Sequence, residues 1–216
     1  MVIRGIALAA AAAAWMALGA ARADDLETAR AALQDGLYPL AQLHAERALA
    51  DGSGDAGEAE AVLAEALAGQ GRYAELLKRL HRVDGRQGLA PEARAYWRAS
   101  ALLNLGRPAE AAQAAAAAQA GATRYADGLR RVCARAKLAA GDLPGALALF
   151  AEADRSTTNA AVRSENALEW AMALAGGGQA EAALEVLKMQ ASLGAPGAGA
   201  SEGALMRGRL LMRGGR

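Results

Sequence analysis

Small and apolar residues recur along the chain at fixed distances from a row of regularly spaced glycines. The glycines are Gly36, Gly71, Gly106, Gly141, Gly178 and Gly215. They follow one another at intervals of 35 or 37 residues. Seven residues before each glycine the residue is small; after the first five glycines, the fifth residue is alanine or leucine and the ninth is apolar. A period in the thirties predicts a repeat protein, in which each repeat packs on its neighbours.

Each glycine is expected to join two packed helices. Glycine readily adopts the left-handed conformation in which many helices end. A second helix then starts almost at once, as at Gly106-Arg107-Pro108, because proline suits a first helical position. The small residues on both sides of the turn let the two backbones approach closely. The pattern predicts the helix pairs 26–35 with 38–50, 58–69 with 73–83, 91–105 with 108–119, 124–140 with 143–154, and 160–175 with 179–192.

The segment 202–213 is predicted to be the first helix of a sixth repeat. Gly208 stands at its small position, and the sequence stops at Arg216. Three apolar residues would then lack a second helix to cover them: Leu205, Leu210 and Leu211. Two interpretations stay open. The helix is a terminal cap, or the chain is truncated within a repeat, which we favour because solenoid caps are normally polar.

The turns resemble those of the tetratricopeptide repeat (TPR) family. The resemblance covers roughly Leu26 to Arg216 and rests on stretches such as LAGQGRYAELLKRL, LLNLGRPAEAAQAAAAA and LAAGDLPGALALFAEA. The chain departs from the family pattern because only the first two turns carry tyrosine, at Tyr38 and Tyr73. The resemblance implies an all-α, right-handed solenoid of antiparallel helix pairs, and a protein–protein interaction scaffold rather than an enzyme. A segment of the partner would lie in a concave groove lined by the first helix of each pair.

The candidate groove residues lie about ten, six and two or three residues before a turn glycine. In the third repeat they are Tyr96, Ser100 and Asn104, and in the fourth they are Arg131 and Arg135. The two arginines are four residues apart, so they share one helix face and can grip a carboxylate of the partner. The alternative is that both are solvated or paired with nearby Glu or Asp.

The composition favours helices and gives no sign of other chemistry. The chain is 54% hydrophobic but only 4% aromatic, and its formal net charge is +1. Acids and bases alternate without a basic cluster, so no nucleic-acid partner is expected. His44 and His81 share no short ligand spacing with each other or with Cys133, so no metal site and no cofactor is expected. A rival function is a structural spacer or assembly subunit of a longer envelope protein, which should show a groove lined by alanine.

The first residues indicate an export signal. Arg4 precedes an uncharged apolar run from Ile6 to Leu18, and the small-x-small pattern Ala21-Arg22-Ala23 follows. We expect residues 1–23 to be removed and the solenoid to occupy residues 24–216 in the bacterial cell envelope, most simply in the periplasm. The alternative is an uncleaved membrane anchor.

Overall fold

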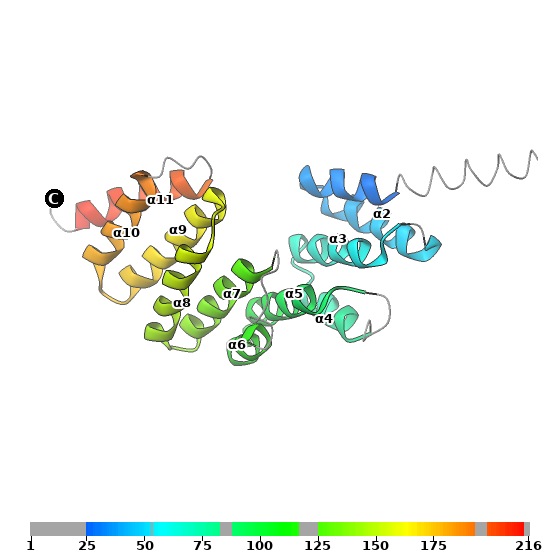
Figure 1. Ribbon diagram of the computed structural model, residues 1–216, viewed down its shortest axis with the longest axis horizontal. Coiled ribbons are helices and arrows are strands. Elements are labelled where there is room, and N and C mark those ends of the chain that lie inside the picture. Colours follow the sequence, from blue (N-terminus) through cyan, green and yellow to red (C-terminus); the bar gives the residue numbers. More distant parts are fainter. Residues whose placement is uncertain (1–24, 53, 83–87, 117–124, 193–197, 214–216) are drawn as a thin grey trace, which may run out of the picture. The chain divides into compact units, whose positions relative to one another are not determined.

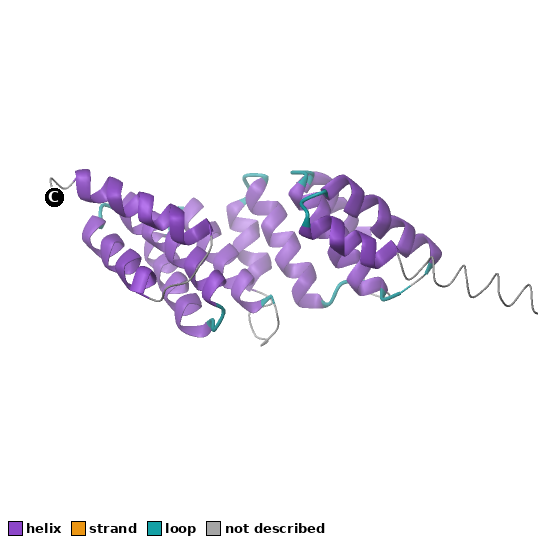
Figure 2. Ribbon diagram, turned by 90° about the horizontal axis from the view of Figure 1, so that it is seen from above, coloured by secondary structure: helices purple, strands orange, loops and turns teal. Residues whose placement is uncertain are grey.

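The computed structural model describes residues 25–52, 54–82, 88–116, 125–192 and 198–213. Every regular element within these ranges is an α-helix, and short loops join the helices (Figure 1; Figure 2). The chain divides into two compact units, Met1–Trp97 and Arg98–Arg216, so each unit is described by itself. The predicted signal segment 1–23 lies outside the described residues.

The first unit holds the first two repeats. Its helices are one over residues 25–34, α2 (Tyr38–Asp51), α3 (Ala56–Gly69), α4 (Tyr73–Arg82) and the first half of α5 (Pro91–Asn104). Helix α3 packs against both α2 and α4. The start of α3 is fixed by Asp55, whose carboxylate accepts the backbone N–H groups of Gly57 at 2.8 Å and Glu58 at 3.3 Å.

The second unit continues the same alternation of helices. After the end of α5 it contains α6 (Pro108–Ala116), α7 (Ala126–Ala139), α8 (Leu143–Ser156), α9 (Ala160–Gly176), α10 (Ala180–Ser192) and α11 (Ala198–Arg213). Each helix from α6 to α11 packs against the next, and α9 also contacts α7 and α11. The first helices of successive repeats, α7, α9 and α11, therefore lie side by side (Figure 1).

Five turn glycines confirm the predicted register. Gly36, Gly71, Gly106, Gly141 and Gly178 have φ between 71° and 85°, in the left-handed region. Each donates its N–H to the carbonyl three residues earlier, and the next residue donates to the carbonyl five residues before it. This pair of hydrogen bonds closes the C-terminus of the first helix. The second helix starts two residues after every one of these glycines.

The small positions of the register form the contact between the helices of each pair. The residues seven before the glycines and five after them are at most 2% exposed. They are Ala29, Ala64, Ala99, Ala134 and Ala171 before the turns, and Ala41, Leu76, Ala111, Ala146 and Ala183 after them. Larger apolar residues fill the space beside these contacts, such as Phe150 next to Ala134 and Ala146. The core also continues from one repeat to the next, since Ala173 of α9 belongs to the same cluster as Phe150.

Individual side chains follow the sequence prediction in most places. Cys133 is buried. Trp97 is buried while Tyr96 is partly exposed, and their rings meet edge to face with centroids 4.9 Å apart. The expectation for Leu210 was wrong, because this side chain packs against the cluster of α9 and α10. Leu205 is exposed, as expected.

Candidate functional site

One register position is accessible and chemically varied throughout the second unit. The residues six before the turn glycines, which we call the groove row, are Ser100, Arg135, Met172 and Arg209 in this unit. Arg135 and Arg209 are exposed, Met172 is 50% exposed and Ser100 is partly exposed. Because α7, α9 and α11 lie side by side, the last three stand at the same level of neighbouring helices. They form a surface of two cations and one flexible apolar side chain.

Arg131, one turn before Arg135 on α7, is engaged by the neighbouring helix. Its Nη1 donates to Oε2 of Glu165 at 2.7 Å, and its Nη2 donates to Oε1 of Glu169 at 2.9 Å. Both carboxylates belong to α9, and the Arg131 side chain is only 20% exposed. Arg131 is therefore paired within the chain, which is the alternative that the sequence had left open for it.

In this ion network, attraction between the charges outweighs the cost of burying Arg131. Burial lowers the pKa of the Arg131 guanidinium, but the charges and hydrogen bonds of Glu169 and Glu165 outweigh burial, so the net shift is upward. The Nε of Arg131 and the Oε2 of Glu169 are both buried with no hydrogen-bond partner. The network joins α7 to α9 and holds the arginine charge in place.

Arg135 presents the more accessible cation on this helix. Its side chain is exposed, and its guanidinium makes no ion pair or hydrogen bond with the described part of the chain. The guanidinium can therefore form a bidentate contact with a carboxylate from outside the chain. That Arg135 contacts a partner stays a prediction.

The predicted site residues of α5 fall on both sides of the boundary between the two units. Asn104 is exposed, and its Nδ2 donates to the carbonyl oxygen of Ser100 at 2.8 Å. Tyr96 belongs to the first unit, so the candidate surface of the second unit does not include it. Ser100 and Asn104 thus offer a polar edge one helical turn long, and their role with a partner also stays a prediction.

The sequence analysis missed the two carboxylates that engage Arg131. Glu165 and Glu169 follow Arg131 by 34 and 38 residues, which is close to one repeat length on either side. Residues separated by one repeat stand on adjacent first helices. Comparing charges at that separation would have pointed to an ion pair, but Glu169 also follows Arg135 by 34 residues, so it would not have told the two arginines apart.

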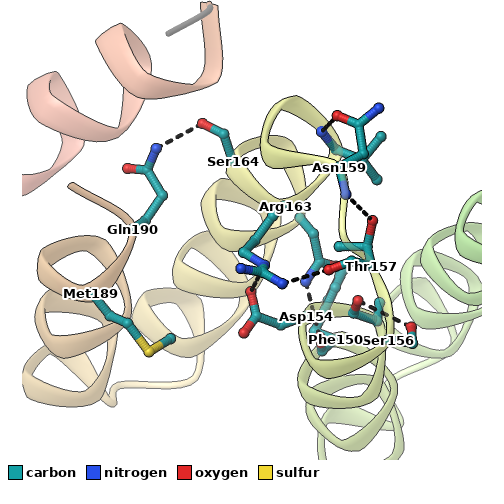
Figure 3. A network of polar contacts seen from close by, with 12 residues as sticks. Phe150, Asp154, Ser156, Thr157, Asn159, Arg163, Ser164, Met189 and Gln190 are labelled. Carbon is teal, nitrogen blue, oxygen red and sulfur yellow. Dashed lines mark hydrogen bonds and ion pairs between the residues drawn. The ribbon is translucent and has the colours of Figure 1, made fainter. Parts of the chain in front are cut away.

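A second polar network is buried between helix pairs, away from the groove row (Figure 3). Asn166 on α9 is fully buried, and its Nδ2 donates to the carbonyl oxygen of Phe150 at 2.9 Å. Gln190 on α10 donates from Nε2 to Oγ of Ser164 at 2.7 Å. Because these side chains are enclosed and bonded to one another or to backbone, they fix how α8, α9 and α10 pack.

The described residues offer no evident centre for metal chemistry. Among them, no group of three or more His, Cys, Asp or Glu side chains is placed to hold a metal ion. His44 instead lies beside Asp25, with 2.6 Å between Nδ1 and Oδ1, and His81 is exposed. Within the same ranges, no helix has both the length and the apolar character needed to cross a bilayer.

Comparison with known proteins supports the fold. No family model and no curated protein matches the chain. Two crystal structures of nearly identical TPR-like repeats, from a Podosopora anserina protein described as a putative kinesin light chain, are similar to it. One of them, a single-residue variant, shares 21% identity at a TM-score of 0.59, covering 78% of this chain and 92% of that one. The other shares 21% identity at a TM-score of 0.58, covering 80% and 94%.

The protein is thus an all-α solenoid of TPR-like repeats. Stacked repeats of this kind present an extended surface.

Proposed function

We propose that the protein is a protein–protein interaction scaffold that binds a segment of a partner along the groove row of its second unit. The groove row itself carries this proposal. The positions seven before and five after the turn are small or apolar and buried, whereas the groove row presents Arg135 and Met172 to solvent. A protein that acts only as a structural spacer should have a groove lined by alanine. No residue of the groove row is alanine. No chemical reaction is part of the proposal.

The exposed side chains indicate the chemistry of the partner segment. Arg131 already holds Glu165 and Glu169, so a carboxylate of the partner would meet Arg135. Met172 on the adjacent helix is flexible and apolar, and it suits an apolar side chain of varied shape. We therefore expect a segment in which an acidic residue or a C-terminal carboxylate lies near an apolar residue.

Reversing the charge of Arg135 is expected to abolish capture of the partner. The Arg135→Glu variant of the chain would be compared with wild type in pull-downs from envelope extract, with captured proteins identified by mass spectrometry. Because Arg135 is exposed and makes no ion pair with the residues that the structure describes, the melting temperature should not change. Arg131 is left intact, since its reversal would disturb the ion pairs with α9.

Arg155→Glu supplies the matched control for this experiment. Arg155 is an exposed arginine on α8, a second helix of its pair, outside the groove row. We expect this variant to capture the same protein as wild type. If the Arg135→Glu variant still captured the partner, the binding site would lie elsewhere, or the protein would be a structural spacer.

We further propose that the protein works in the bacterial cell envelope after residues 1–23 are removed. The support is the sequence alone: Arg4, the apolar run to Leu18 and the Ala21-Arg22-Ala23 pattern. Expression in a bacterial host should give a periplasmic form whose intact mass begins at or near Asp24. If the protein instead stays in the membrane and its mass includes Met1, residues 1–23 are an uncleaved membrane anchor.

A further inference from the structure

The two carboxylates that hold Arg131 differ in their exposure to solvent. The side chain of Glu169 is 21% exposed, whereas that of Glu165 is 56% exposed. Glu169 accepts a hydrogen bond from Nη2 of Arg131, and Glu165 accepts one from Nη1. Within the described part of the chain, this is the only hydrogen bond that the Glu165 carboxylate makes. Glu165 thus holds one nitrogen of the guanidinium from a largely open position.

The contact of Arg131 with Glu165 is the weaker of the two. An ion pair with an exposed carboxylate contributes little, because water solvates the separated charges almost as well. Burial lowers the pKa of the Arg131 guanidinium, and among the groups that raise this pKa, Glu169 has a larger effect than Glu165. Glu165 can therefore leave Arg131 at small cost while Glu169 keeps the guanidinium in place.

Departure of Glu165 would leave two guanidinium groups available on one face of α7. Arg135 is exposed and stands one turn after Arg131, about 6 Å further along the helix axis. Two arginines in this arrangement can hold one carboxylate between them. Lys and Arg also outnumber Asp and Glu in the second unit, so its net charge favours an acidic segment.

We propose that Glu165 is an internal competitor of the partner's carboxylate. The incoming carboxylate meets Arg135, displaces Glu165 from Nη1 of Arg131, and is then held by both arginines, while Glu169 stays on Nη2. This inference rests on the proposed function, because it describes how the same surface takes an acidic residue. Glu165 thereby adds specificity: a carboxylate that reaches only Arg135 gains no second cation, and only one that reaches both arginines replaces Glu165.

Fluorescence anisotropy with two labelled peptides tests the proposal on the full chain at low ionic strength. One peptide ends in Leu-Glu with a free C-terminus, and the other ends in Leu-Gln with an amidated C-terminus and carries no carboxylate. Wild type should bind the acidic peptide only, and Arg135→Glu should abolish this binding. Glu165→Gln should bind the acidic peptide about three to ten times more tightly than wild type, because the competing carboxylate is gone.

Two further variants separate displacement from simple charge repulsion. Glu152→Gln is the matched control, since Glu152 is 53% exposed and pairs with Arg130 of α7, but it lies on α8 outside the groove row. This variant should bind the acidic peptide as wild type does. Glu165→Asp keeps the negative charge on a shorter side chain, which weakens its hold on Arg131. Displacement predicts tighter binding by Glu165→Asp than by wild type, whereas repulsion alone predicts equal affinity.

Nuclear magnetic resonance of the side-chain carboxyl carbons gives a direct readout of the displacement. Adding the acidic peptide to wild type should shift the signal of Glu165 and leave that of Glu169 in place.

The outcomes distinguish this inference from the proposed function on which it rests. If the acidic peptide binds through Arg135 but the Glu165 signal does not move and the variants at Glu165 match wild type, the proposed function stands and the displacement is wrong. If the acidic peptide binds neither wild type nor Glu165→Gln, both the proposed function and the displacement are wrong.

Discussion

The Arg131→Glu variant is expected to lose about 2–4 kcal/mol of unfolding free energy, because it places a third carboxylate beside Glu169, which is largely buried, and Glu165, which is half exposed. The new carboxylate would face Glu165 and Glu169, which now share the guanidinium. Attraction would become repulsion between three carboxylates, and the contact between α7 and α9 would weaken. Denaturant unfolding followed by circular dichroism measures the loss as a lower midpoint.

Arg135→Glu is the control for that measurement. It makes the same change one turn later on the same helix, at an exposed position, and should shift stability by no more than about 0.5 kcal/mol. Adding Glu169→Arg to Arg131→Glu should recover part of the loss, because the pair is then restored in the opposite sense. Equal losses for the two single variants would show that the ion network contributes little.

Most of the fold could be predicted because the residues that start and end its helices act locally. Glycine is the residue that most readily takes the left-handed conformation in which helices end, so one residue type at a fixed interval located five helix turns correctly. The N-cap of α9 is equally local, since the side chain of Asn159 accepts the N–H of Ala161 at 3.0 Å. These features depend on a few neighbouring residues.

The start of α11 shows where such local reasoning fails. The stretch before Glu202 is rich in glycine and alanine, and the sequence pattern predicted a helix only from Glu202 onward. The helix begins instead at Ala198, about one turn earlier. Its packing on α9 and α10, with Gly203 buried against α10, favours the added turn over the weak local preference.

The candidate site was less predictable because it depends on stacking between repeats. The sequence placed Arg131 and Arg135 on one face of a helix, as the register requires. It could not show that the next first helix would engage one arginine and leave the other accessible. That difference arises from Glu165 and Glu169, whose approach to Arg131 follows only from the packing of α9 beside α7.

The Ala183→Leu variant is expected to lose about 1–3 kcal/mol of unfolding free energy through overpacking. Ala183 is fully buried in the same cluster as Ala171, which holds the matching small position of α9. A leucine there adds three carbon atoms where two helices approach most closely, and Leu187 already fills the adjacent space. For a chain of this length, the melting temperature should fall by several degrees.

Ala182→Leu provides a control one residue away on the same helix. Ala182 is exposed, so its extra side chain would extend into solvent and should change stability by no more than about 0.5 kcal/mol. Ala99→Leu and Ala134→Leu, at fully buried small positions of earlier repeats, should behave like Ala183→Leu. The register assigns all three residues to helix contacts, so all three melting temperatures should fall. If they stayed level with that of Ala182→Leu, the small positions would not set the distance between the helices, and the repeat register would lose its structural meaning.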